Sequence, residues 1–177
     1  MKIVVISGSP RKDGLTQIPM RYVYDHVRAK EPDTAFINLA EDGIECYRGY
    51  GIEYNDATKK TAQLITDADV WLVGTPIYNS FFSGAIKNVF EYINYKATPG
   101  KVAGMAILAS GNIGFTDVQT LLTQLLSYFR VIANPKAVYM TVNDDLPGST
   151  LSEPAKARLR EMVDDTLEMA RKVRGRS

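Results

Sequence analysis

The stretch KIVVISGSPRKDGLT, residues 2–16, determines how the rest of the sequence is interpreted. Residues 2–7 are aliphatic on both faces, which is typical of a central strand in a parallel sheet that is buried on both sides. The chain then leaves this strand through two glycines, a proline, two hydroxyl side chains and adjacent positive charges. An ordinary turn needs neither the hydroxyls nor the charges. The stretch therefore predicts a buried first strand that ends at an anion-binding loop.

Strand-like and helical patterns alternate along the rest of the chain. Aliphatic runs predict further strands at residues 34–39, 69–75, 102–110 and within 130–142. Helical periodicity predicts helices at residues 16–28, 56–66, 83–95, 118–129 and 152–174, with Thr16 and Ser152 as N-caps. Five strand–helix repeats indicate one α/β domain over residues 1–177, a doubly wound five-stranded parallel sheet with helices on both faces. One common strand order, 2-1-3-4-5, places ligands beyond the carboxyl ends of the strands.

Composition excludes several classes of function. The chain has 177 residues, 45% of them hydrophobic, and a net charge of +1, so no global charge favours nucleic acid or a membrane surface as partner. Its one cysteine, Cys46, can form neither an internal disulfide nor a multi-thiolate metal centre, and we expect no metal site. No signal peptide or membrane-spanning stretch is evident, which predicts a cytoplasmic protein. The basic residues 171–177 are interpreted as a solvated helix end.

Unusual chemistry gathers at one edge of the predicted sheet. Glycine, serine, threonine, asparagine and proline are frequent just after the strands ending near residues 7, 75 and 110. In the first of these loops, Ser9 and Thr16 offer hydroxyl donors and Arg11 a forked cation, next to the positive end of a helix. A phosphate group suits this donor set. The alternative is a tight turn in which Arg11 lies in water.

Other phosphate-binding motifs do not fit this loop. The nucleotide P-loop has four residues between its glycines and then a lysine, whereas five residues separate Gly8 from Gly14 and Leu15 stands at the lysine position. The GxGxxG fingerprint is absent. A receiver domain needs acidic residues after the first strand, and none precedes Asp13. A phosphatase of the Cys-x5-Arg type needs its thiolate in this loop, but Cys46 lies elsewhere.

Three segments together resemble the NADPH-dependent FMN reductase family of flavodoxin-like proteins. They are GSPRKDGLT at 8–16, TPIYNSFFSGAIKN at 75–88 and ASGNIG at 109–114. The resemblance implies bound FMN, NADPH or NADH as reductant, and a small electron acceptor such as free flavin or a quinone. It assigns the FMN phosphate to Ser9, Arg11 and Thr16. It assigns the flavin ring to Pro76, Tyr78, Asn79, Ser80, Ser110, Gly111, Asn112 and Gly114, with no catalytic side chain, because the flavin carries the chemistry.

The sequence departs from the family pattern in both main motifs. Gly14 replaces a serine of the phosphate loop, and Phe81 and Ser83 replace a serine and a proline of the second motif. The changes in the second motif resemble the sulfonate-linked FMN reductase branch. An alternative function is an FMN-binding electron carrier without its own NAD(P)H turnover. Such carriers are typically strongly acidic, which the net charge of +1 disfavours.

Aromatic residues outside these motifs allow two interpretations. Tyr47, Tyr50 and Tyr54, within the long segment 40–55, either cover the flavin, from this chain or a neighbouring subunit, or pack on their own domain. On the predicted helix 83–95, Ala85, Tyr92 and Tyr95 widen the apolar stripe, which predicts a homodimer or homotetramer. We expect structural roles for His26, Lys87 and Asn88. The sequence does not specify the acceptor or choose between NADPH and NADH.

Overall fold

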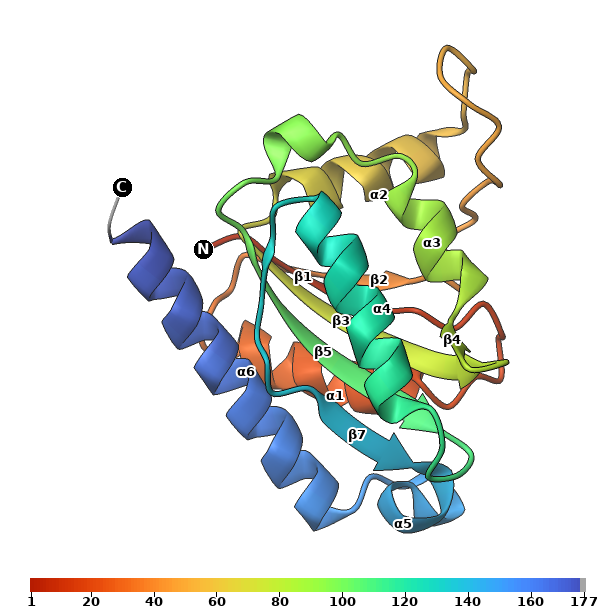
Figure 1. The fold of residues 1–177 in the computed structure, drawn as a ribbon, viewed down its shortest axis with the longest axis vertical. Helices are drawn as coiled ribbons and strands as arrows, with labels where there is room; N and C mark the ends of the chain where they lie inside the picture. Colours follow the sequence, from red (N-terminus) through yellow and green to blue (C-terminus); the bar gives the residue numbers. More distant parts are fainter. Residues whose placement is uncertain (176–177) are drawn as a thin grey trace.

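A twisted, mainly parallel sheet lies between two layers of helices (Figure 1). The computed structural model describes residues 1–175. The strands are β1 (Ile3–Ser7), β2 (Thr34–Asn38), β3 (Val70–Tyr78), β4 (Phe81–Phe82), β5 (Val102–Ala109), β6 (Ile132–Ala133) and β7 (Val138–Thr141). The helices are α1 (Gln17–Arg28), α2 (Asp56–Asp67), α3 (Gly84–Phe90), α4 (Phe115–Tyr128), α5 (Val142–Asp145) and α6 (Glu153–Arg174).

The predicted strand order is confirmed for the five main strands, which run β2-β1-β3-β5-β7 and are all parallel. The sheet nevertheless has seven strands. The short β4 folds back antiparallel on β3, and the last strand is divided into β6 and β7, which pair with the two ends of β5. Pro135 lies in this interruption, where a residue without an N–H group cannot continue the ladder.

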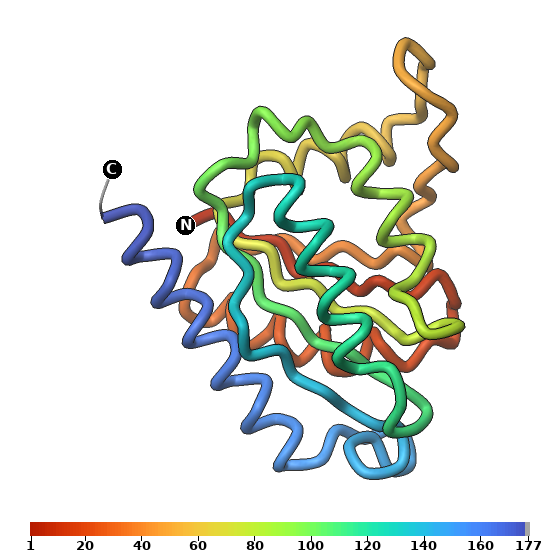
Figure 2. Tube along the Cα trace, in the orientation of Figure 1, coloured from red at the N-terminus to blue at the C-terminus, as the bar shows by residue number. Residues whose placement is uncertain are grey.

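Alternate side chains of the strands contact opposite helical layers. Figure 2 shows the path of the chain through the sheet and these layers. Val5 and Leu72 pack in one core with α1 and α6. Ile6 and Trp71 pack in the other with α2, α3 and α4. Burial on both faces explains why the strands read as continuous aliphatic runs.

The end of the third helix and the cap of the first differ from prediction. The third helix ends at Phe90 rather than Tyr95, and the chain turns before a short 3₁₀ helix (Tyr95–Ala97) that Asn94 caps. Thr16 was expected to cap α1, and this expectation is wrong: its backbone is already helical and its side chain makes no cap hydrogen bond. The predicted cap Ser152 is confirmed, since it accepts from the Ala155 N–H at 3.3 Å.

The absence of a side chain at Gly74 lets the Met20 side chain of α1 pack directly against β3. A Cβ atom at Gly74 would overlap with Cγ and Sδ of Met20, which is fully buried on α1. Since α1 begins directly after loop 8–16, this close contact also holds that loop against the strand ends.

The basic end of α6 is paired with acidic groups of the same chain. Arg171 lies 3.1 Å from Glu31, and Arg174 forms an ion pair with Asp69. Both arginine side chains are more than half exposed, as expected for a solvated helix end. Residues 176 and 177 of this basic segment lie outside the described residues. None of the described helices is long and apolar enough to cross a membrane.

Candidate functional site

The carboxyl ends of β1, β3 and β5 surround a pocket of about 460 Å³. Predicted site residues from all three loops line it: Arg11, Thr16, Pro76, Tyr78 and Ser110. Apolar side chains complete the walls, among them Leu15, Leu108 and Val142, which the sequence patterns had not singled out. The structure thus brings together at one site three segments that are far apart in the sequence.

The first loop is fixed to the second by a contact between side chains. The hydroxyls of Ser9 and Tyr78 share a hydrogen bond at 3.2 Å, across 69 positions of sequence, and the Arg11 N–H also donates to Ser9 Oγ. A Cβ atom at Gly14 would overlap with this Oγ and lie 2.8 Å from the carbonyl oxygen of Arg11. In this loop conformation, therefore, the family's serine does not fit at position 14.

Hydrogen-bond donors at the start of α1 have no acceptor within the chain. The backbone N–H groups of Leu15, Thr16 and Gln17 make no hydrogen bond among residues 1–175, as is usual for the first turn of a helix. Thr16 lines the pocket with a hydroxyl that is not used for capping. These donors, at the positive end of a twelve-residue helix, fit the phosphate group of FMN.

Arg11 is engaged by its own loop. Its Nε and Nη2 atoms donate to the two carboxylate oxygens of Asp13, at 3.1 and 2.8 Å. These hydrogen bonds and the charge attraction lower the pKa of Asp13 and raise that of Arg11. Both side chains are largely exposed, 62% and 76%, so the pair remains open to exchange with another anion.

The second loop has an uncommon backbone. Asn79 and Ser80 both have positive φ angles, 49° and 61°, in the tight turn between β3 and β4. Residues other than glycine rarely adopt this conformation, and neighbouring structure must hold them there. A Cβ atom at Gly114 would lie 3.6 Å from Ile77 and 4.0 Å from the Cα of Ser80, so the third loop touches the second.

Ser83 stabilises the join between these elements. It is fully buried, caps α3 by accepting from the Ile86 N–H, and donates to the carbonyl oxygen of Gly8. The residue that replaces the family's proline thus ties the end of β1 to the start of α3.

Not every predicted residue lines the same pocket. Ser9 is buried beside the pocket, where it bonds to Tyr78. Asn79, Ser80, Gly111 and Gly114 lie on the adjoining loops, and Asn112 lines a neighbouring hollow instead. Within residues 1–175 no cluster of His, Cys, Asp or Glu side chains is arranged to hold a metal ion.

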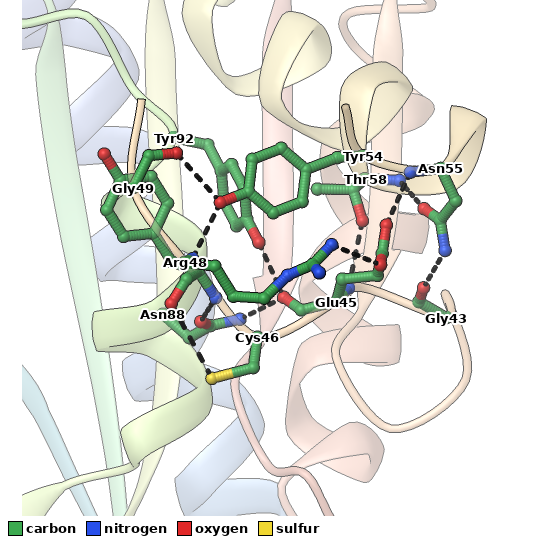
Figure 3. Close-up of polar contacts among 11 residues, drawn as sticks. Gly43, Glu45, Cys46, Arg48, Gly49, Tyr54, Asn55, Thr58, Asn88 and Tyr92 are labelled. Carbon is green, nitrogen blue, oxygen red and sulfur yellow. Dashed lines mark hydrogen bonds and ion pairs between the residues drawn. The ribbon is translucent and has the colours of Figure 1, made fainter. Parts of the chain in front are cut away.

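Segment 40–55 is anchored to α3 and to the turn after it (Figure 3). Asn88 accepts from the Tyr47 N–H and donates to the Glu45 carbonyl oxygen, both at 2.8 Å. The Tyr92 hydroxyl donates to the same carbonyl at 2.7 Å. The expected structural role of Asn88 is consistent with these contacts.

The tyrosines of this segment pack mainly on their own chain. Tyr47 and Tyr54 place their rings edge-on to Tyr92, with centroids 5.3 and 4.9 Å away. Burial and the neighbouring Tyr54 raise the pKa of Tyr92 to about 12. Tyr50 differs, since it is 94% exposed at the tip of the segment. Tyr47 and Tyr54 therefore pack on their own domain, which is one of the two interpretations that the sequence allowed.

Comparison with known proteins agrees with the geometry. The model of the family described as NADPH-dependent FMN reductase matches residues 1–145. An NADPH azoreductase from Bacillus sp. (strain OY1-2) is 29% identical over 93% of this chain and 90% of its own. A 2-hydroxy-1,4-benzoquinone reductase from Burkholderia sp. is 23% identical, over 93% of each. The structure of FerB, a flavoenzyme NAD(P)H:(acceptor) oxidoreductase from Paracoccus denitrificans, shares the fold with a TM-score of 0.75, at 22% identity and 97% coverage of each chain.

Proposed function

This chain belongs to the NADPH-dependent FMN reductase family, and we propose that the pocket at the ends of β1, β3 and β5 holds its FMN. The protein is an FMN-dependent NAD(P)H oxidoreductase with a flavodoxin-like fold. Bound FMN supplies the redox chemistry, taking a hydride from the nicotinamide and passing electrons to an acceptor. The protein's part is to bind, orient and stabilise charge.

The free donors at the start of α1 carry this proposal. The amides of Leu15, Thr16 and Gln17, together with the Thr16 hydroxyl at the pocket wall, would bind the phosphate group. The Ser9 hydroxyl is buried and shares a hydrogen bond with Tyr78, so it would have to turn toward the ligand to join them. Arg11 would add a charged contact after exchanging Asp13 for the phosphate. A terminal monophosphate suits this helix start, whereas FAD would have to lead its adenylate away from it.

The other two loops would hold the flavin ring. Pro76 and Tyr78 line the pocket, and Asn79 and Ser80 bring backbone groups to the same turn. Backbone donors of residues 110–112, followed by Gly114, would stabilise negative charge at the polar edge of the ring after reduction. Hydride transfer to the flavin does not require a side chain that donates a proton to the ring. No catalytic acid or base is therefore assigned.

We infer that the acceptor is a small molecule such as a quinone, an azo compound or free flavin. Relatives named for azo and benzoquinone reduction match more than nine-tenths of the chain, which supports this class. Because NAD(P)H is a metabolite of the cytoplasm, we also infer that the protein works there.

We propose a homodimer or homotetramer, with a contact face that differs from the one expected. Tyr92, part of the expected face, bonds to Glu45 of its own chain. Tyr95 and Tyr128 remain exposed, Tyr128 by 65%, and their ring centroids lie 5.7 Å apart. They border a hollow of about 510 Å³ between α3 and α4. Light scattering should give a multiple of the chain mass of 19.6 kDa, and a monomer at micromolar concentration would refute this face as an interface.

Cofactor content and anaerobic reduction test the assignment. We expect about one FMN per chain after purification, and NADPH or NADH should bleach its visible absorbance. A protein that retains FMN but is reduced by neither nucleotide would be an electron carrier. A colourless protein that ignores added FMN would contradict the pocket assignment altogether.

A further inference from the structure

A second hollow, of about 580 Å³, adjoins the proposed flavin pocket. Neighbouring residues of two segments line the two spaces: Ser110 and Val142 face the flavin pocket, and Asn112 and Thr141 face the second hollow. Of the residues assigned to FMN, Asn112 lines this hollow, and it stands at the junction of the two spaces. The hollow is therefore an additional space within reach of a ligand that extends from the flavin pocket.

The lining of this hollow combines flat aromatic rings with charges of both signs. Phe115 and Tyr139 lie nearly parallel, with ring centroids 4.9 Å apart and planes at 17°. Lys136 and Arg158 supply cations, and Asp144 supplies a carboxylate. Aromatic faces suit a stacked base, cations suit phosphate, and a carboxylate suits ribose hydroxyls.

Several of these polar groups retain capacity for a ligand. The Lys136 ammonium forms an ion pair with Glu161, yet its side chain is 56% exposed and an ammonium has three N–H donors. Asp144 accepts from the Thr141 hydroxyl through one oxygen, and its other oxygen accepts no hydrogen bond among the described residues.

Asp145, in contrast, is structural. It is buried and accepts from the Thr141 N–H at 2.8 Å and from Arg158 at 2.6 Å, which ties α5 to α6. The variants that test this hollow therefore leave Asp145 and Arg158 unchanged.

We propose that the second hollow binds the adenosine-phosphate half of the nicotinamide nucleotide. The base would lie against the aromatic rings, a phosphate at Lys136 and ribose hydroxyls at Asp144. This inference rests on the proposed function, because a dinucleotide whose nicotinamide lies at the flavin must place its other half nearby. The adjoining hollow offers all three kinds of contact in one place.

Calorimetric titration with ADP-ribose, which lacks the nicotinamide, tests the hollow without redox chemistry. We expect the FMN-loaded protein to bind it, and Lys136→Gln to weaken it roughly tenfold, as for loss of a charged hydrogen bond. Lys156→Gln is the matched control, because Lys156 is also paired with a carboxylate, 2.7 Å away, but does not line the hollow. Absence of binding at millimolar ADP-ribose, or equal effects of the two variants, would overturn the proposal.

The aromatic contact needs a separate pair of variants. Tyr139→Leu should weaken ADP-ribose severalfold, whereas Tyr139→Phe keeps the ring, loses only the hydrogen bond to Gln119, and should bind like the parent. Thermal unfolding establishes that both variants are folded. If Tyr139→Leu is folded and binds normally, the base does not lie here.

Kinetics separates this inference from the proposed function. Lys136→Gln should raise the KM for NADH or NADPH with little change in kcat, and leave the KM for reduced nicotinamide mononucleotide unaltered. An equal rise for the mononucleotide would refute the hollow as the adenosine site. Failure of the parent protein to bind FMN would instead refute the proposed function, whatever ADP-ribose does.

Discussion

The carboxylate of Asp13 accepts hydrogen bonds from Nε and Nη2 of the Arg11 guanidinium, two residues away in the same loop. Asp13 thus occupies the donors that a phosphate group at this loop would need. To gain the full forked contact with Arg11, an anionic ligand must displace this exposed carboxylate. Such an exchange costs part of the ligand's binding free energy.

Removing this competitor should tighten FMN binding. We expect Asp13→Asn to lower the Kd for FMN severalfold, because the amide leaves Arg11 free and removes a negative charge from the loop. Fluorescence titration of the apoprotein measures the change. Asp25→Asn, an exposed change on α1 with the same loss of charge, controls for net charge and should have little effect.

Removing the cation should have the opposite effect. Arg11→Ala is expected to weaken FMN by about tenfold or more, since hydrogen bonds to charged groups contribute roughly 1.5–3 kcal/mol. Lys12→Ala, at the neighbouring position, should change the affinity little. Riboflavin lacks the phosphate and should bind the parent and both variants alike. If Arg11→Ala weakens riboflavin as much as FMN, the residue supports the loop and not the phosphate.

The loop should not accept a side chain at position 14. Gly14→Ala would force the new Cβ against Ser9 Oγ, displacing the Ser9–Tyr78 contact, and we expect FMN affinity to fall at least tenfold. Gly84→Ala is the matched control, because a Cβ there meets nothing within 4 Å. Equal affinities for the two variants would show that loop 8–16 can rearrange freely.

The stability of the fold at high pH should depend on Tyr92. Its pKa is raised from 10 to about 12 in the folded chain, so folding favours the neutral phenol. The resulting stabilisation is complete below pH 10 and is lost as the pH rises through 12. At neutral pH, Tyr92→Phe should lower the free energy of unfolding by about 1 kcal/mol through loss of the bond to Glu45.

Urea unfolding at several pH values tests this difference. Between pH 10 and 12 the parent should lose stability more steeply than Tyr92→Phe, because only the parent ionises at this position. Parallel pH profiles would show that Tyr92 is not shielded by segment 40–55 in solution.

The sequence was sufficient to predict the strands and most helices, because buried parallel strands and amphipathic helices leave strong local patterns. The strand order, and with it the meeting of three loops, followed from the common topology of five-stranded parallel sheets. The sequence was insufficient where a boundary or contact depends on distant groups. The apolar pattern continues past Phe90, but α3 does not, because residues 92–95 contact segment 40–55 and α4. Similarly, no local pattern indicates that Asn88 binds a backbone 41 positions away. The Arg11–Asp13 ion pair, in contrast, could have been predicted, because the two opposite charges lie two residues apart in one short loop.

The Met20 side chain occupies the space between α1 and β3 that a side chain at position 74 would need. Position 74 can therefore accept a side chain only after position 20 has changed. A smaller residue at position 20 must come first, since only the space it vacates would admit a methyl group at position 74. Thermal unfolding of Met20→Ala, Gly74→Ala and the double variant should show Gly74→Ala harmful in the parent and tolerated after Met20→Ala. Substitutions at these two positions can therefore accumulate in only one order during evolution. This constraint holds although neither residue lines the proposed flavin pocket.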